Sequence, residues 1–210
     1  LLTGIVDADK LPRIAENLLD ENKFWGKYVI PSLSKDDVEY GKPSRVPEFD
    51  EPYPPYCYWR GNIWAPTNYL VYQALKRAEL DGIASEFAQK SVELWHRTWE
   101  KTGWCCENYD PETGDRSKMS HCHQSWTQLL PLIGVQELLD AEIWEPGSIM
   151  FGTRLKGANA LHNMRIRGEL YDLTTDDTSL RLVRNGRLIF VAEGAKCAVR
   201  RYNGHSFDLF

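Results

Sequence analysis

Aromatic side chains gather around an arginine in the segment YPPYCYWRGNIWAPTNYLVY, residues 53–72. Seven of its 20 residues are aromatic, and Arg60 and Asn62 stand between Trp59 and Trp64. Flat aromatic rings can cover the apolar C–H face of a sugar, while guanidinium and amide groups bind its hydroxyls. If this aromatic strip lines a pocket, it predicts a carbohydrate-binding site.

Glu107 is the carboxylate that the sequence favours for acid–base chemistry. It lies in the loop segment WCCENYDPETGD, residues 104–115, between Trp104 and Tyr109. A carboxylate that faces a pocket can hold a water molecule and remove its proton. Because further acids follow in the same segment, the alternative is a solvated acidic loop with no chemical role.

Arg60 and the two indoles beside it each have two interpretations. The forked donors of Arg60 can bind a sugar or a carboxylate, or they can form a structural ion pair with another acid. An arginine that positions a catalytic base would do both. Trp59 and Trp64 are either sugar platforms or ordinary core residues. Core is the better interpretation of any single tryptophan, but less so for a cluster of this kind.

Other kinds of site are disfavoured. His121, Cys122 and His123, with the adjacent Cys105 and Cys106, match no zinc-binding spacing. The chain has no nucleophile-elbow sequence and no glycine motif that binds phosphate. We therefore expect neither a metal nor a cofactor.

Composition is that of a soluble globular protein. The 210 residues are 42% hydrophobic and 26% charged, with a net charge of −5. This charge disfavours nucleic acid and anionic membranes as partners. Five cysteines, two of them adjacent, indicate free thiols and favour a reducing compartment. The start, LLTGIVDADK, has neither Met nor a signal peptide, so we expect a fragment or a processed chain.

Helical periodicity predicts four helices before residue 140. They are expected at about residues 7–22, 66–81, 83–101 and 123–139. Asp7 should cap the first helix, Pro66 should open the second, Gly82 should separate the second from the third, and Gly103 should end the third. The expected buried positions of the second helix are Leu70, Val71, Ala74, Leu75 and Ala78, and those of the third include Phe87, Leu94, Trp95 and Trp99.

After residue 140 the pattern changes to short alternating runs between turn signals. Asn185-Gly186 is a strong two-residue hairpin signal, and Asn203-Gly204 repeats it. The sequence therefore predicts an antiparallel β segment over about residues 143–210.

Three separated segments together resemble glycoside hydrolase family 63 and its bacterial relatives. They are YWRGNIWAPTNYLVYQAL, ENYDPETGD and HQSWTQLLPLIGVQELL. With the opening of the chain they cover roughly residues 1–140, in the order and spacing of that family. The family shares a clan with the family 37 trehalases.

The resemblance implies an (α/α)6 barrel that hydrolyses an α-glycosidic bond with inversion at the anomeric carbon. It implies that Glu107 is the general base. The residues implied for the subsite of the cleaved sugar and its surroundings are Tyr58, Trp59, Arg60, Gly61, Trp64, Tyr109 and Trp126.

The chain departs from the family pattern in one respect. The general acid of the family is an aspartate in a segment that resembles ESGWD-x-S-x-R-W, and the 210 residues contain no such segment. Inverting hydrolysis needs two carboxyl groups, and four helices are too few for a barrel of twelve. We therefore expect the missing N-terminal part of the same barrel as a partner, beside an oligosaccharide or glycoside substrate.

The resulting fold prediction is a mainly α chain in two parts. Residues 1–140 would form the C-terminal part of an (α/α)6 catalytic domain, and residues 141–210 a small antiparallel β-sandwich-like cap. Two other functional classes stay open: a non-catalytic carbohydrate-binding or regulatory module, and a structural helical protein whose aromatic strip binds a partner.

Overall fold

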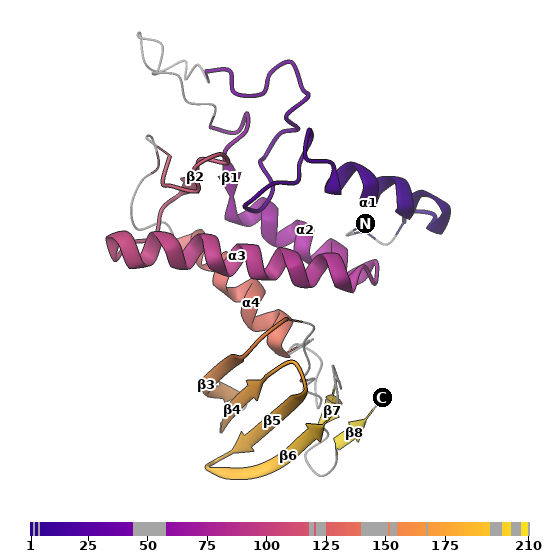
Figure 1. Ribbon diagram of the computed structural model, residues 1–210, viewed down its shortest axis with the longest axis vertical. Coiled ribbons are helices and arrows are strands. Elements are labelled where there is room, and N and C mark those ends of the chain that lie inside the picture. The colour runs from indigo at the N-terminus through magenta and orange to yellow at the C-terminus, as the bar shows by residue number, and fades with distance from the viewer. Residues whose placement is uncertain are drawn as a thin grey trace. The chain divides into compact units, whose positions relative to one another are not determined.

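The computed structural model describes residues 1, 3, 5–43, 58–117, 120, 125–139, 151, 155–166, 168–193, 199–202 and 207–209. The chain divides into two compact units, Leu1–Ile133 and Gly134–Phe210. The described residues form four α-helices and a four-stranded antiparallel sheet, so the architecture is mixed, whereas the sequence predicted a mainly α chain (Figure 1).

The first helix, α1 (Leu11–Leu19), follows a single 3₁₀ turn (Ala8–Lys10). Asp7 stands at the expected start, but its side chain makes no capping hydrogen bond. The carboxylate instead accepts a hydrogen bond from Lys10 Nζ at 2.6 Å. Asp7 therefore stands at an N-cap position, as predicted, but does not cap through its side chain.

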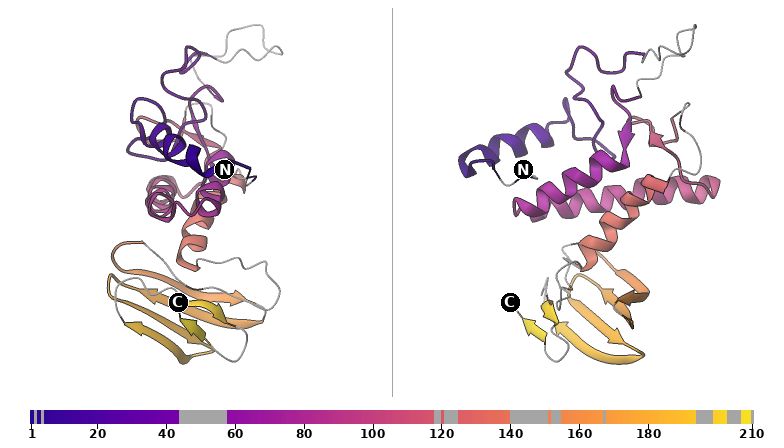
Figure 2. Two further views of the ribbon diagram at one scale, coloured as in Figure 1. Left: turned by 90° about the vertical axis from the view of Figure 1, so that its right-hand side faces the viewer. Right: turned by 180° about the vertical axis from the view of Figure 1, so that it is seen from behind.

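Helices α2 (Ala65–Arg77) and α3 (Asp81–Thr102) pack against each other, with α3 running back along α2 (Figures 1 and 2). Pro66 lies in the first turn of α2, as predicted. Gly103 ends α3 with a φ of 67°, and its N–H donates to the carbonyl of Trp99 at 2.7 Å. Gly82 does not separate the helices, because it lies inside α3. The chain reverses at Glu79, whose φ is 58°.

The buried face of α2 matches the prediction at Ala74 and Leu75 and differs from it at two other positions. Leu70 is 51% exposed, while Asn68 is fully buried. The Asn68 amide bonds to both main-chain groups of Ile30 and to the carbonyl of Trp64, at 2.8 to 3.1 Å. Because these bonds satisfy a buried polar group, the helix turns Asn68 inward and Leu70 outward. On α3, the predicted core residue Trp99 is likewise 45% exposed.

Two very short strands join the aromatic strip to the loop of Glu107. Strand β1 (Ile63–Trp64) pairs antiparallel with β2 (Asn108–Tyr109), so that Ile63 lies opposite Tyr109 and Trp64 opposite Asn108 (Figure 1). All four residues are buried. No local pattern predicted this pairing, which connects segments more than 40 residues apart.

Helix α4 (Leu129–Leu139) follows a 3₁₀ turn at Ser125–Gln128. The sequence predicted one helix from about residue 123, and residues 121–124 lie outside the described residues. Leu130 and Ile133 of this helix are fully buried.

The second unit contains a meander of four antiparallel strands in the order β3-β4-β5-β6. The strands are β3 (Asn159–Ile166), β4 (Glu169–Thr175), β5 (Ser179–Arg184) and β6 (Arg187–Glu193). A further antiparallel pair joins β7 (Val199–Tyr202) to β8 (Phe207–Leu209). The core is centred on Phe151, Tyr171, Leu173 and Leu182.

The predicted turn at Asn185-Gly186 is confirmed. It joins β5 to β6, and both residues have positive φ, 50° and 77°. These are the backbone conformations that a tight hairpin turn with the right-handed strand twist requires. The second predicted turn, Asn203-Gly204, lies outside the described residues.

The carboxylate of Asp176 stabilises the turn between β4 and β5. We expect the stability of this hairpin to fall in acid. Its carboxylate accepts hydrogen bonds from the N–H and hydroxyl groups of Thr178 and Ser179, at 2.7 to 3.0 Å. These bonds, led by the Thr178 hydroxyl, lower its pKa from 3.8 to about 2. The unfolded chain therefore binds the proton first, so this contribution to stability is complete above about pH 4 and is lost as the pH falls towards 2.

We expect Asp176→Asn to lower the thermal midpoint at pH 6 and to reduce its fall between about pH 4 and 2, the window set by the lowered pKa. Circular dichroism melts of the whole protein at several pH values measure both effects. Equal acid sensitivity in the wild type and the variant would contradict this role of Asp176.

Candidate active site

The pairing of β1 with β2 brings Tyr58 to Glu107. The Tyr58 hydroxyl donates a hydrogen bond to Glu107 Oε1 at 3.3 Å, and Glu107 is only 6% exposed. Tyr58 has a φ of 44°, a left-handed conformation that costs a non-glycine residue energy. Two donors hold its carbonyl: Trp64 Nε1 at 3.1 Å and the Asn62 N–H at 3.2 Å. The aromatic strip and the carboxylate predicted from the sequence thus meet at this hydroxyl.

Tyr58 belongs to a cluster of four aromatic rings centred on Trp64. Trp59 stacks on Trp64 with ring centroids 3.8 Å apart and planes 7° from parallel. Tyr58 and Trp126 meet Trp64 edge-on, with centroids 4.8 and 5.9 Å away. Trp64 is fully buried, whereas Trp59 and Trp126 are 46% and 39% exposed. Trp64 is therefore a core residue that supports the cluster, and the exposed indoles are the ones with ring area available to a sugar.

Arg60 pairs with the carboxylate of Glu39 and not with that of Glu107. Its guanidinium lies 3.3 Å from Glu39 Oε2 and donates to the carbonyl of Pro43 at 3.1 Å. Lys42, followed by Arg60, holds the pKa of Glu39 below its usual value. Both partners of the Arg60–Glu39 pair are about half exposed, so the pair adds little stability. These contacts match the structural interpretation of Arg60, and a sugar contact at this residue stays a prediction.

Gly61 and Tyr109 lie in the scaffold around the cluster. Gly61 has a φ of 143°, which favours glycine, and its N–H donates to Ser32 Oγ at 3.2 Å. Tyr109 is fully buried on β2 beside Cys106, and its burial raises the pKa of its hydroxyl above the usual value. A substrate contact at Tyr109 also stays a prediction.

Tyr28 anchors the loop that carries Glu107, and no sequence pattern pointed to it. Its hydroxyl donates to the carbonyl of Thr113 at 2.8 Å, across 85 positions of the chain. Its ring lies against Gly114, where a Cβ atom would come within 2.3 Å of the ring. Gly114 has a φ of 67° and donates its N–H to the carbonyl of Asp110 at 2.9 Å. The loop position is therefore set by a long-range contact that only the fold reveals.

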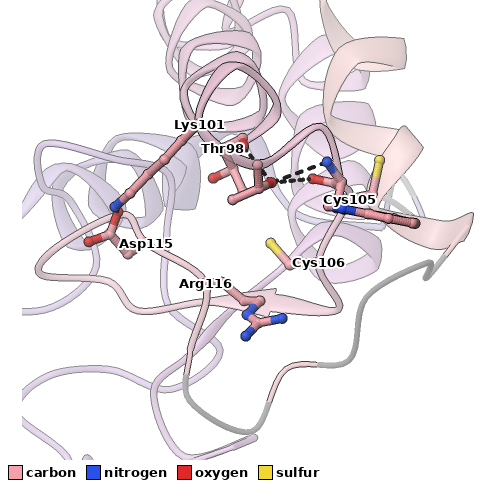
Figure 3. Close-up of a pocket in the computed structure, with 8 residues that line it drawn as sticks. Thr98, Lys101, Cys105, Cys106, Asp115 and Arg116 are labelled. Atoms are coloured by element: carbon pink, nitrogen blue, oxygen red, sulfur yellow. Dashed lines mark hydrogen bonds and ion pairs between the residues drawn. The ribbon is translucent and has the colours of Figure 1, made fainter.

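A pocket of about 320 Å³ lies at the C-terminal end of α3, next to this loop (Figure 3). It is lined by Thr98, Lys101, Thr102, Trp104, Cys105, Cys106, Asp115 and Arg116. Lys101 Nζ lies 3.1 Å from Asp115 Oδ1, so this ion pair occupies one side of the pocket (Figure 3). Glu107 is not among the lining residues.

The buried thiol in this pocket should be chemically inert. Cys106 is 1% exposed, and burial raises its pKa from 9.0 to about 12. Because the thiolate is the nucleophile, we expect iodoacetamide to leave Cys106 unmodified in the folded protein at about pH 8 and to alkylate it after unfolding in guanidinium chloride. Peptide mass spectrometry measures the modified fraction. Alkylation of Cys106 in the folded protein as fast as that of a small free thiol would contradict this expectation.

Cys105 and Cys106 are both free, and the other three cysteines lie outside the described residues. Within the described part of the chain, no three His, Cys, Asp or Glu side chains cluster in a way that could hold a metal ion. Among the same residues, no helix has both the length and the apolar character that crossing a membrane requires.

The sequence model of the mannosylglycerate hydrolase MGH1-like glycoside hydrolase domain matches residues 1–127. The chain belongs to this family of glycoside hydrolases. The matched residues contain Tyr58, Glu107 and Trp126, and the predicted membership of glycoside hydrolase family 63 is confirmed.

Two curated proteins are similar to part of this chain. A probable mannosyl-oligosaccharide glucosidase of Schizosaccharomyces pombe is 29% identical over 142 residues, which are 62% of this chain and 16% of that protein. The mannosylglycerate hydrolase MGH1 of Selaginella moellendorffii is 32% identical over 114 residues, or 54% of this chain and 20% of that protein. The chain thus spans about a sixth to a fifth of the length of these relatives.

One solved structure is also similar to part of this chain. It is the GH63 mannosylglycerate hydrolase from Thermus thermophilus in complex with glucose, with a TM-score of 0.47 and 22% sequence identity. The similarity covers 64% of this chain and 27% of that one.

Proposed function

We propose that these residues are part of a glycosidase that hydrolyses α-glucosides or related α-linked oligosaccharides with inversion of the anomeric carbon. They supply the general base and part of the sugar-binding subsite. The family match, and relatives named as glucosidases and mannosylglycerate hydrolases, support this assignment.

The observation that carries the proposal is the position of Glu107 among aromatic rings. Its Oε1 accepts the Tyr58 hydrogen bond at 3.3 Å, and Tyr58 in turn contacts Trp64 in the aromatic cluster. A carboxylate that faces a sugar-binding surface can hold a water molecule and remove its proton. The exposed rings of Trp59 and Trp126 provide flat apolar surface for a pyranose beside it.

In the proposed reaction, Glu107 removes a proton from a water molecule as the water oxygen bonds to the anomeric carbon. The bond from that carbon to the glycosidic oxygen breaks on the opposite face of the ring. A second carboxyl group donates a proton to the leaving oxygen, and inverting enzymes place the two carboxyl groups roughly 6.5 to 9.5 Å apart. We assign this acid to a segment outside these 210 residues.

The same segment would complete the barrel. Leu70 on α2 and Trp99 on α3 are 51% and 45% exposed, and Trp99 stacks on Trp95 at 5.5 Å. Further helices of an (α/α)6 barrel would cover apolar side chains of this kind. We also propose that residues 1–140 form part of the barrel and that residues 141–210 form a small β cap.

The stereochemistry of hydrolysis tests the proposed function. The whole protein would be incubated with α-D-glucosyl fluoride and α-D-mannosyl fluoride, and proton NMR would identify the sugar anomer that forms first. We expect the β-anomer, because inversion places the new hydroxyl opposite the departing fluoride. First formation of the α-anomer would contradict inversion. Hydrolysis of neither fluoride would favour the non-catalytic carbohydrate-binding module.

A further inference from the structure

We propose that Asn62 and Asn108 form a buried amide bridge that positions Glu107, an inference that rests on the proposed function. Asn62 Nδ2 donates to Asn108 Oδ1 at 2.8 Å. The two residues are 4% and 0% exposed, and they come from the two segments that the site brings together. The sequence offered Asn62 only as a sugar-binding amide and assigned Asn108 no role.

Asn108 is the residue next to Glu107, and several of its polar groups have partners. Its Oδ1 accepts a second hydrogen bond, from the Ser117 hydroxyl. Its N–H donates to Ser120 Oγ at 3.0 Å, and its carbonyl accepts from the Ser117 N–H at 3.2 Å. On the other side of Glu107, the carbonyl of Cys106 accepts a hydrogen bond from the Thr127 hydroxyl. The backbone is therefore held on both sides of the carboxylate.

Asn62 ties the same bridge to the aromatic strip. Its N–H donates to the carbonyl of Tyr58 at 3.2 Å, and its carbonyl accepts from the Ser32 N–H at 3.0 Å. Tyr58 is the residue whose hydroxyl reaches Glu107. Two connections thus run between Tyr58 and the base: one through the phenol and one through the two amides.

The bridge is needed because the strand pairing is too short to fix its own register. Strands β1 and β2 have two residues each, so few backbone hydrogen bonds oppose a slip. A slip by one residue would turn the side chains of the β2 segment to the opposite face. The amide bridge opposes that slip. A slipped β2 segment would move Asn108 Oδ1 away from Asn62 Nδ2 and the Ser117 hydroxyl, and these two buried donors would lose their acceptor. It therefore fixes which face Glu107 presents.

Asn108 also shows which bonds decide its orientation. Among the described residues its buried Nδ2 has no hydrogen-bond partner. Within that part of the chain the amide donates no hydrogen bond, while its oxygen accepts from Asn62 and Ser117. The orientation of the Asn108 side chain is therefore set by its acceptor oxygen, Oδ1, which joins the two segments.

The test measures kcat and KM separately for variants of the whole protein with α-D-glucosyl fluoride and α-D-mannosyl fluoride. Fluoride leaves without protonation, so its release reports on the water and the base, with little dependence on the general acid. The variants are Asn62→Ala, Asn108→Ala and the double variant. Leu94→Ala is the control, because Leu94 is fully buried on α3 and its truncation destabilises the fold without touching the bridge.

We expect each single substitution to lower kcat about tenfold to a hundredfold, with KM within about threefold of wild type, as for a displaced catalytic group. The double variant should be no slower than the slower single variant, because the two amides act as one unit. Leu94→Ala should lower the thermal midpoint and leave kcat within about twofold. The inference is overturned if the single variants keep kcat within about twofold, or if their effects multiply in the double variant.

Ser117→Ala keeps the test decisive if the asparagine variants do not fold. It removes one of the two hydrogen bonds to Asn108 Oδ1, and we expect kcat to fall several-fold. An unchanged kcat in this variant would also overturn the inference. Glu107→Gln, measured in parallel, separates the two proposals: if it is inactive while the bridge variants are unaffected, only the bridge fails. If it keeps full activity, the proposed function fails and the bridge has no base to position.

Discussion

Replacing Glu107 with Gln should lower kcat for the two glycosyl fluorides by roughly two to four orders of magnitude, the usual contribution of a general base. The amide keeps the size of the carboxylate and can still accept the Tyr58 hydrogen bond, which is 3.3 Å long in the wild type. It cannot take a proton from water at neutral pH. Because the aromatic cluster that would bind the sugar is unchanged, KM should stay within a few-fold of wild type. Steady-state rates of fluoride release measure both quantities.

Glu112→Gln is the matched control. It makes the same chemical change in the same loop, but Glu112 is exposed, whereas Glu107 is buried. We expect wild-type kcat and KM for this variant. A loss of less than about tenfold in Glu107→Gln, or an equal loss in both variants, would remove Glu107 from the mechanism.

The second large effect is expected at Gly114. Its φ of 67° alone should cost an alanine about 1 to 2 kcal/mol of folding free energy. Its Cβ would also come within 2.3 Å of the Tyr28 ring. Tyr28 cannot move aside freely, because its hydroxyl is bonded to Thr113 in the same loop. Overpacking of this kind adds about 1 to 3 kcal/mol. We therefore expect Gly114→Ala to lower the thermal midpoint strongly and to reduce kcat, because the loop carries Glu107.

Gly103→Ala isolates the contribution of the clash. Gly103 has the same φ, 67°, but its Cβ position has no atom of a non-neighbouring described residue within 4 Å. Its substitution should show only the cost of the left-handed backbone and leave kcat unchanged. Calorimetric melts of the whole protein measure the difference between the two variants. Equal shifts in the thermal midpoint would mean that the contact between Tyr28 and Gly114 is not the reason for the larger effect.

Local chemistry let the sequence predict several elements of the fold. Pro66 and Gly103 mark helix ends because one lacks an N–H and the other adopts a positive φ without strain. Asn185-Gly186 marks a hairpin because both residues tolerate a positive φ. The predicted break at Gly82 was wrong because the chain leaves α2 after Arg77 and Gly82 is the second residue of α3, where the interior penalty of glycine does not apply.

The buried face of α2 could not be read from apolar spacing alone. Leu70 is exposed and Asn68 is buried because Asn68 bonds to main-chain groups of Ile30, 38 positions away. A period-based prediction assigns polar residues to the surface, and it fails where a distant partner satisfies the polar group. The same limit applies to Arg60, whose ion-pair partner Glu39 lies in another segment.

For the candidate site, the sequence by itself determined which residues are candidates for the chemistry: a glutamate in a polar loop, and an aromatic strip around an arginine. Residue type and motif are local properties, and they also carried the family resemblance. Only the tertiary structure decided that Tyr58 reaches Glu107, that Arg60 pairs with Glu39, and that Asn62 and Asn108 join the two segments. These contacts link residues far apart in the chain, and their free energy depends on burial and geometry that exist only after folding.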